Sequence, residues 1–121
     1  MRTIPTREFG TGTDQPAKVR KWALDLLSGL APESLADAVL VLDELVSNVL
    51  RHGRTPARVR LVRKAGHLRF EVTDASPRPA RPRPPDVDGG RGLMMIGACS
   101  RRWGQWQHDG GKTVWAELAV G

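Results

Sequence analysis

Residues 44–53 read ELVSNVLRHG and place the carboxylate of Glu44 one helical turn before the amide of Asn48. At about 100° per residue, the two side chains lie roughly 40° apart around a helix axis. They share the side that faces away from the apolar stripe of that helix. Most pairs of this kind simply belong to a solvated helix face. The pair therefore needs a ligand site elsewhere in the chain to give it chemical meaning.

A second carboxylate, Asp74, ends the alternating segment HLRFEVTD (67–74). The apolar residues of this segment face the core, and Asp74 has the same parity, so its carboxylate is aimed along the buried face. A buried carboxylate without a partner costs on the order of several kcal/mol. We therefore expect a donor beside it, either an arginine, a helix N-terminus or a ligand amine. The alternative is that the strand ends at Thr73 and that Asp74 turns toward solvent.

Three glycines surround an arginine in GGRGL (89–93), directly before an apolar run. Glycines let backbone amides approach a ligand closely, and the N-terminus of a following helix attracts anions. This pattern is typical of a phosphate site, although most single GxG pairs are only turns. The later GGKT (110–113) is not a P-loop, because the first glycine of that motif is missing and a strand follows.

Two amphipathic helices are predicted in the first half of the chain. Asp14 is suited to cap the first helix, Pro16 lies in its first turn, and apolar residues recur at helical spacing as far as Leu30. Pro32 is suited to open the second helix and Gly53 to end it as a C-cap. The apolar stripe expected on the second helix consists of Leu35, Val39, Leu42, Val46 and Val49.

The remaining segments predict strands, one loop and one short helix. Residues 2–9 can form a first strand, and the alternating segments 57–64 and 67–74 form two strands joined by a tight turn at Ala65–Gly66. Residues 75–90 hold five prolines and cannot form a regular element.

A short helix is expected at 93–100, and a closing hairpin at 101–107 and 112–120. This order predicts an α+β fold, a two-layer sandwich with helices on one face of a mixed, largely antiparallel sheet.

The composition bounds the class of protein. With 121 residues, 40% of them hydrophobic and 26% charged, the chain is expected to form one globular domain over residues 1–121. It has no apolar run of membrane-spanning length and no signal-peptide core near its N-terminus, so we expect a cytoplasmic protein. The single Cys99 excludes an internal disulfide and favours a small buried side chain over a reactive thiol.

The net charge of +6 favours anionic ligands. A nucleic-acid reading is the weaker alternative, because only Arg78, Arg81 and Arg83 cluster and no groove-reading motif accompanies them.

Taken together, the motifs resemble those of the GHKL (Bergerat-fold) ATPases, and most closely the small branch of anti-sigma-factor serine kinases and related ATP-binding regulators. ELVSNVLRHG is similar to the N box of that branch, and VTDASPRP (72–79) to its first glycine-box position. GGRGLMMIGACSRRWG (89–104) and GGKTVWAEL (110–118) are similar to its second glycine box and closing hairpin. The wider superfamily has Asp-x-Gly-x-Gly where this chain has Asp74-Ala75-Ser76-Pro77.

The resemblance implies a Mg²⁺-dependent ATP site in a Bergerat fold. Glu44 would be the general base near the γ-phosphate, Asn48 would bind Mg²⁺ and the nucleotide, and Asp74 would accept a hydrogen bond from the adenine amino group. Residues 75–90 would form the ATP lid. The other nucleotide-binding residues implied are Gly90, Arg91, Gly92 and Leu93 at the phosphates and Thr113 near the adenine.

The function implied is that of an ATP-binding anti-sigma-factor regulator, a serine/threonine protein kinase that phosphorylates an anti-sigma-factor antagonist. Its partners would be a sigma factor and that antagonist, with no direct contact to nucleic acid or membrane. The resemblance also allows a homodimer. The alternative is a non-catalytic ATP-binding module that sequesters a protein partner, and the presence of Glu44 favours the kinase.

Overall fold

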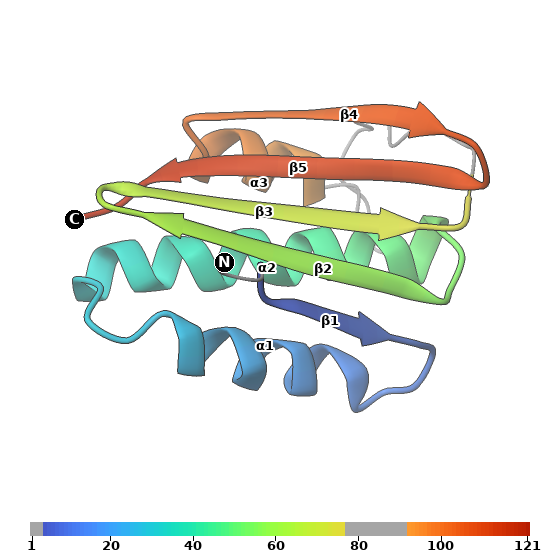
Figure 1. The fold of residues 1–121 in the computed structure, drawn as a ribbon, viewed down its shortest axis with the longest axis horizontal. Helices are drawn as coiled ribbons and strands as arrows, with labels where there is room; N and C mark the ends of the chain where they lie inside the picture. The colour runs from blue at the N-terminus through green and yellow to red at the C-terminus, as the bar shows by residue number, and fades with distance from the viewer. Residues whose placement is uncertain (1–3, 77–91) are drawn as a thin grey trace.

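The computed structural model describes residues 4–76 and 92–121, in which three helices cover one face of a five-stranded sheet (Figure 1). The strand order is β1-β2-β3-β5-β4, and each of the four pairings is antiparallel. The expected α+β class and its two-layer arrangement are confirmed. In chain order the elements are β1 (Thr6–Phe9), α1 (Gln15–Leu26), α2 (Pro32–His52), β2 (Ala57–Lys64), β3 (His67–Asp74), α3 (Gly92–Cys99), β4 (Arg102–His108) and β5 (Gly111–Ala119).

The alternating patterns predicted the central hairpin correctly, because β2 and β3 have the expected bounds. Gly66 has a φ of +72° in the turn between them, a conformation that glycine adopts without steric cost. The first strand is shorter than expected and begins at Thr6. The predicted loop at 75–90 lies outside the described residues from position 77 onward.

The helix α1 begins after Asp14, with Pro16 in its first turn as predicted. The Asp14 side chain makes no capping hydrogen bond and instead forms an ion pair with Lys18 at 2.9 Å. The helix ends at Leu26, earlier than the apolar pattern indicated, and Gly29 turns the chain with a φ of +86°.

The helix α2 lies between α1 and α3 and packs on the sheet (Figure 1). It opens with Pro32 and ends before Gly53, as expected. The predicted apolar stripe was partly wrong, because Leu35 and Val39 are only half-buried. Since α2 contacts β3, β5, α1 and α3, its buried face is wider than one stripe. The fully buried residues of α2 are Ala38, Val41, Leu42, Leu45, Val46 and Val49.

The core lies between the helices and the sheet, where alternate strand residues are buried. On β5 these residues are Val114, Ala116 and Leu118, which fixes the facing of every other residue on that strand. No helix within the described ranges is long and apolar enough to cross a lipid bilayer.

Candidate functional site

Asp74 ends β3 and points to the helix-covered side of the sheet, as its parity predicted. The β3–β5 register sets it directly opposite Lys112, and Nζ of Lys112 lies 2.8 Å from Oδ2 of Asp74. The Asp74 side chain is only 1% exposed and the Lys112 side chain only 2%. The buried carboxylate therefore has a cationic partner within the protein, and this partner is a lysine where an arginine or a helix N-terminus was expected. The expected ligand amine stays a prediction.

The two oxygens of the Asp74 carboxylate have different surroundings. Oδ1 accepts a hydrogen bond of 2.6 Å from the backbone N–H of Ser76, which orients the carboxylate. Oδ2 is buried and accepts no hydrogen bond from the described residues, so its contact with Lys112 is an ion pair without hydrogen-bond alignment. An ionised carboxylate oxygen is by its chemistry an acceptor for N–H donors.

Two glycines make room for this carboxylate and its backbone. A Cβ at Gly53 would lie 2.7 Å from Oδ2 of Asp74, and a Cβ at Gly111 would overlap the carbonyl oxygen of Asp74. Gly53 does end α2 and donates its N–H to Val49, but its φ of −97° is open to any residue. The glycine at position 53 is therefore needed for close approach to Asp74, and not for a left-handed helix cap.

Glu44 and Asn48 are half-buried and lie on one side of α2. Asp37 lies on the same side of α2 two turns earlier. Its negative charge affects the thiol of Cys99, the last residue of α3. Burial first, and the charge of Asp37 second, raise the pKa of the Cys99 thiol. Because α3 runs antiparallel to α2 (Figure 1), its first residue, Gly92, lies toward the Glu44–Asn48 end.

The N-terminus of α3 is therefore the part of that helix nearest to Glu44 and Asn48. Leu93, its second residue, is buried in the core. Gly90 and Arg91, which the sequence also pointed to, lie outside the described residues. Within the described ranges, no group of three or more His, Cys, Asp or Glu residues could hold a metal ion.

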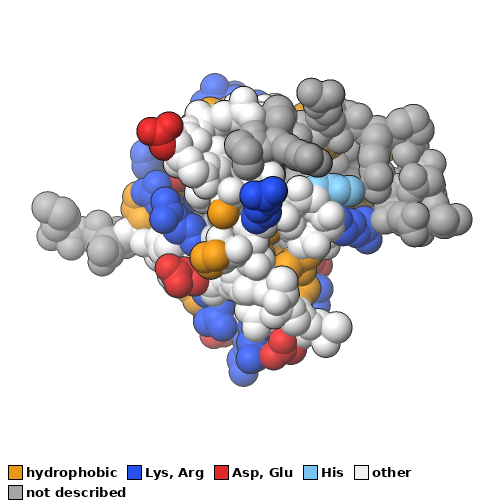
Figure 2. Space-filling view, turned by 90° about the vertical axis from the view of Figure 1, so that its right-hand side faces the viewer, with side chains coloured by type: hydrophobic (Ala, Val, Ile, Leu, Met, Phe, Trp, Pro, Cys, Tyr) orange, Lys and Arg blue, Asp and Glu red, His pale blue; other side chains and the backbone are white. Residues whose placement is uncertain are grey.

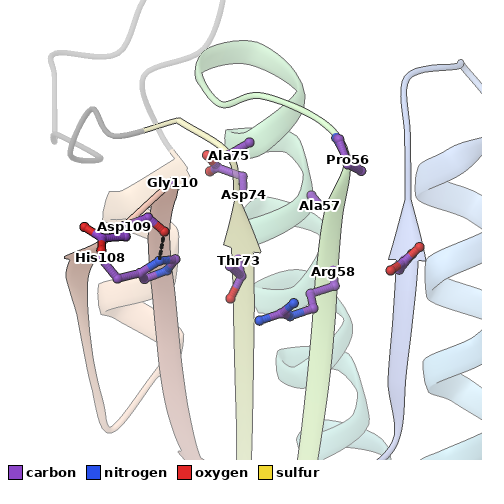
Figure 3. A pocket seen from close by; sticks show the side chains of 10 residues that line it. Pro56, Ala57, Arg58, Thr73, Asp74, Ala75, His108, Asp109 and Gly110 are labelled. Carbon is purple, nitrogen blue, oxygen red and sulfur yellow. Dashed lines mark hydrogen bonds between the residues drawn. The ribbon is translucent and has the colours of Figure 1, made fainter.

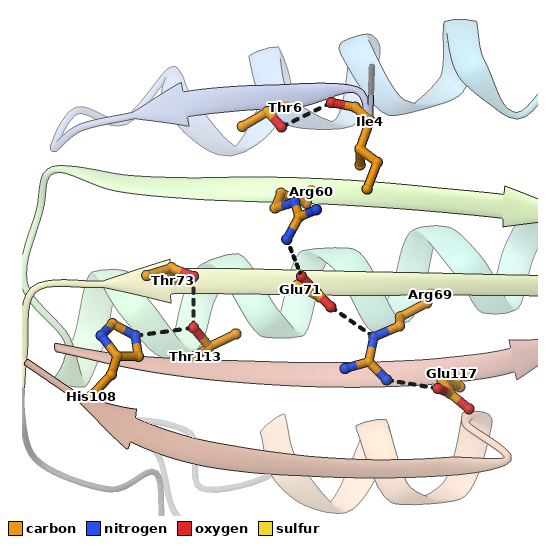
Figure 4. Close-up of polar contacts among 9 residues, drawn as sticks. All are labelled: Ile4, Thr6, Arg60, Arg69, Glu71, Thr73, His108, Thr113 and Glu117. Carbon is orange, nitrogen blue, oxygen red and sulfur yellow. Dashed lines mark hydrogen bonds and ion pairs between the residues drawn. The ribbon is translucent and has the colours of Figure 1, made fainter. Parts of the chain in front are cut away.

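Thr113 is not brought together with the Asp74 carboxylate. It follows Lys112 on β5, so its side chain points to the open face of the sheet (Figure 4). There its hydroxyl lies 2.8 Å from the hydroxyl of Thr73 and 3.2 Å from Nε2 of His108. A hollow of about 290 Å³ opens beside these residues at the end of β3, between β2 and the β4–β5 hairpin (Figure 3).

The open face carries a ladder of ion pairs that crosses the sheet (Figure 4). Arg60 contacts Glu71, Arg69 bridges Glu71 and Glu117, and Arg102 contacts Glu117. Hydrogen bonds from Arg102 and then Arg69 lower the pKa of the Glu117 carboxyl to about 2, against the opposing effect of its burial. The guanidinium of Arg69 also stacks 4.4 Å above the centroid of Trp115.

Among the described residues, the end of the molecule at which β3 terminates shows no continuous patch of one charge (Figure 2). Over the described residues of this face, basic side chains are scattered among polar and apolar ones (Figure 2). This distribution accords with the spread of arginines along the sequence.

Comparison with known proteins identifies the family. Residues 11–118 match the family described as the histidine kinase-like ATPase domain. This chain belongs to that family, which confirms the GHKL resemblance.

One curated protein and one solved structure are similar to this chain. The uncharacterized protein SCO4941 of Streptomyces coelicolor is 42% identical over 83 residues, which cover 63% of this chain and 79% of that protein. The structure of the RsbU and RsbW domains of Rv1364c from Mycobacterium tuberculosis matches 96% of this chain, with a TM-score of 0.70 and 21% identity. This chain spans 32% of the length of that protein chain, and the similarity concerns the fold.

Sequence reasoning missed Lys112 as a residue of the site. The signal was present, because Val114, Ala116 and Leu118 alternate on β5 and extend the buried parity back to Lys112. A lysine of buried parity, two residues before a core valine, indicates a carboxylate partner.

Proposed function

We propose that this protein is an ATP-binding regulator of the anti-sigma-factor type that uses Mg²⁺·ATP to phosphorylate a serine or threonine of an antagonist protein. One observation carries the proposal. In a chain of the histidine kinase-like ATPase family, a buried carboxylate at the end of β3 has one oxygen that accepts no hydrogen bond from the described residues and is paired with the ammonium of Lys112. That oxygen, Oδ2 of Asp74, suits the exocyclic amine of adenine.

The adenine and phosphate contacts divide between two regions. Asp74 accepts a hydrogen bond from the adenine amine, while Ser76 holds the carboxylate in its rotamer. The backbone amides of Gly92 and Leu93, at the start of α3, bind the phosphates, because a helix N-terminus offers unpaired N–H groups and a positive dipole end. Gly90 and Arg91, which precede this helix in the sequence, are assigned to the phosphates by the resemblance alone. The hydroxyl of Thr113 takes no part in these contacts, since it points to the open face.

Glu44 and Asn48 act at the phosphate end of the site. Asn48 would hold Mg²⁺, which neutralises phosphate charge and which proteins commonly bind through one or two side chains plus phosphate oxygens. As the serine oxygen bonds to the γ-phosphorus and ADP leaves, Glu44 accepts the hydroxyl proton.

The partners follow from the same assignment. A sigma factor binds the regulator, and the antagonist protein supplies the phosphorylated hydroxyl. The sequence resemblance to anti-sigma-factor serine kinases supports this choice, as does the fold shared with the structure that contains the RsbW domain. We place the protein in the cytoplasm, where both partners work.

Two substitutions on α2 test the kinase assignment. Glu44→Ala is expected to keep Mg²⁺·ATP binding within a few-fold and to lower phosphotransfer by about 10² to 10⁴, the usual contribution of a general base. Asn48→Ala should impair both, because it removes a metal ligand. Glu33→Ala, at an exposed glutamate in the first turn of α2, is the matched control and should change neither.

The readouts are calorimetric nucleotide binding and transfer of labelled γ-phosphate to candidate antagonists. If the wild-type protein binds ATP but labels no antagonist, the kinase assignment fails. The chain would then be a module that sequesters its partner in an ATP-dependent way without turnover.

A further inference from the structure

We propose that Lys112 is an internal competitor of the nucleotide base, whose ammonium must leave Asp74 before a purine can bind there. This inference rests on the proposed nucleotide site and concerns its regulation. It assigns the buried ion pair a function beyond stability. The residues involved are Lys112, Asp74 and the two glycines beside them.

The closed state follows from the burial of the pair. The Asp74 side chain is 1% exposed and Nζ of Lys112 lies 2.8 Å from Oδ2, the distance at which a base amine would also bind. The backbone of Gly53 also limits the space around Oδ2, because a Cβ added at Gly53 would lie 2.7 Å from this oxygen. A purine amine therefore cannot reach this oxygen while the ammonium keeps its position.

The Lys112 side chain can change its position more readily than the Asp74 carboxylate can. The Asp74 carboxylate is tied to the Ser76 N–H. Lys112 stands at the start of β5, next to the Gly110–Gly111 turn, and its ammonium sits on a flexible four-carbon stem. The exocyclic amine of an arriving adenine nucleotide supplies a replacement donor for Asp74.

The energetic consequence is a reduced apparent affinity. When only a fraction of molecules has the carboxylate uncovered, the apparent dissociation constant rises by the inverse of that fraction. Removing the ammonium uncovers Asp74 permanently. Nucleotides should then bind more tightly.

Calorimetric titration with Mg²⁺·ATP and Mg²⁺·ADP tests this competition. Lys112→Met, which keeps the length of the side chain and removes its charge, is expected to bind both nucleotides at least tenfold more tightly than wild type. Lys112→Gln serves as a second neutral variant. The matched control is Lys18→Met, which removes an exposed lysine whose ion pair with Asp14 lies at the surface. The control should bind like wild type.

The outcomes separate this inference from the proposed function. If wild type binds ATP and both Lys112 variants bind equally well or more weakly, the competition is overturned and the nucleotide site stands. If neither wild type nor any folded variant binds a nucleotide, the nucleotide site itself fails and the competition with it.

A measurement on the wild-type protein covers the case in which the variants do not fold. With ¹⁵N-labelled lysine, the buried Lys112 ammonium should give a slowly exchanging NMR signal in the free protein. Saturation with Mg²⁺·ADP should remove that signal or shift it to a solvent-exchanging position. A signal that persists unchanged at saturation would show that the base does not displace Lys112.

Discussion

Oδ2 of Asp74 lies against the Cα of Gly53, so close that a Cβ at position 53 would come within 2.7 Å of it. One residue follows the end of α2 and the other ends β3, so this contact joins the helix layer to the sheet at the candidate site. The backbone N–H of Ala75 reinforces the junction through a 3.0 Å hydrogen bond to the carbonyl of Arg54. The position of the carboxylate is therefore set by the helix end as much as by its own strand.

Gly53→Ala should destabilise the protein by about 1–3 kcal/mol, because the added methyl group forces Asp74 or the helix end to move. Urea unfolding measures the change. Gly10→Ala is the control, since a Cβ at Gly10 meets nothing within 4 Å. Equal stability of the two variants would mean that the junction tolerates the methyl group.

The buried pair should show strong thermodynamic coupling. Lys112→Met or Asp74→Asn alone is expected to cost about 3–5 kcal/mol of folding free energy, because each leaves its partner buried without a counterpart. The double variant should lose much less than the sum of the two. Denaturant unfolding of all four proteins gives the coupling free energy, and additive losses would contradict a direct pairing.

The nucleotide preference should depend on Asp74. An ionised carboxylate accepts hydrogen bonds, so it favours the amine of adenine over the carbonyl oxygen of guanine. Asp74→Ala should weaken ATP binding by about 1.5–3 kcal/mol, while Asp109→Ala, at an exposed aspartate of the β4–β5 hairpin, should not. Competition between ATP and GTP measures the preference, and equal affinities for the two nucleotides in wild type would refute the assignment.

Glu117 should contribute an acid-sensitive part of the stability. Its folded pKa of about 2 lies below the ordinary value of 4.5, so the contribution is present above pH 4.5 and lost as the pH falls toward 2. Glu117→Gln should lower the free energy of unfolding by on the order of 1–2 kcal/mol at pH 7. This loss is smaller than the pKa shift alone implies, because the Arg102 side chain is largely exposed and solvent screens its charge.

The difference between Glu117→Gln and wild type should shrink when urea unfolding is repeated near pH 3. Glu33→Gln, at an exposed residue, should show no such dependence on pH. A constant difference from pH 7 to pH 3 would indicate that the variant acts through packing and not through charge.

Local patterns predicted the elements well because their causes are local. The alternation in residues 57–64 and 67–74 follows from the period of a strand with one buried face, and the helix from Pro32 to His52 follows from apolar spacing and a proline that suits its first position. The burial of Asp74 was predictable for the same reason.

The details of the site depend on contacts between distant segments, which periodicity does not encode. Gly53 was predicted as a helix C-cap, yet a glycine is needed at this position because Asp74, at the end of β3, leaves no room for a Cβ. Thr113 and Lys112 are neighbours in one motif, and their roles separate only when the facing of β5 is known. The parity of Val114 would have separated them, so this part was recoverable from the sequence.

The interior place of β5 has a consequence for synthesis on the ribosome. This strand is the last element of the described chain, yet it pairs with β3 on one side and β4 on the other. While a nascent chain lacks β5, the edge of β3 presents unpaired backbone groups, and Asp74 has no lysine to neutralise it. The surroundings of the carboxylate proposed to select the nucleotide are thus complete only when the final strand inserts. A chain that has not reached this step has an open sheet edge, which can pair with other chains.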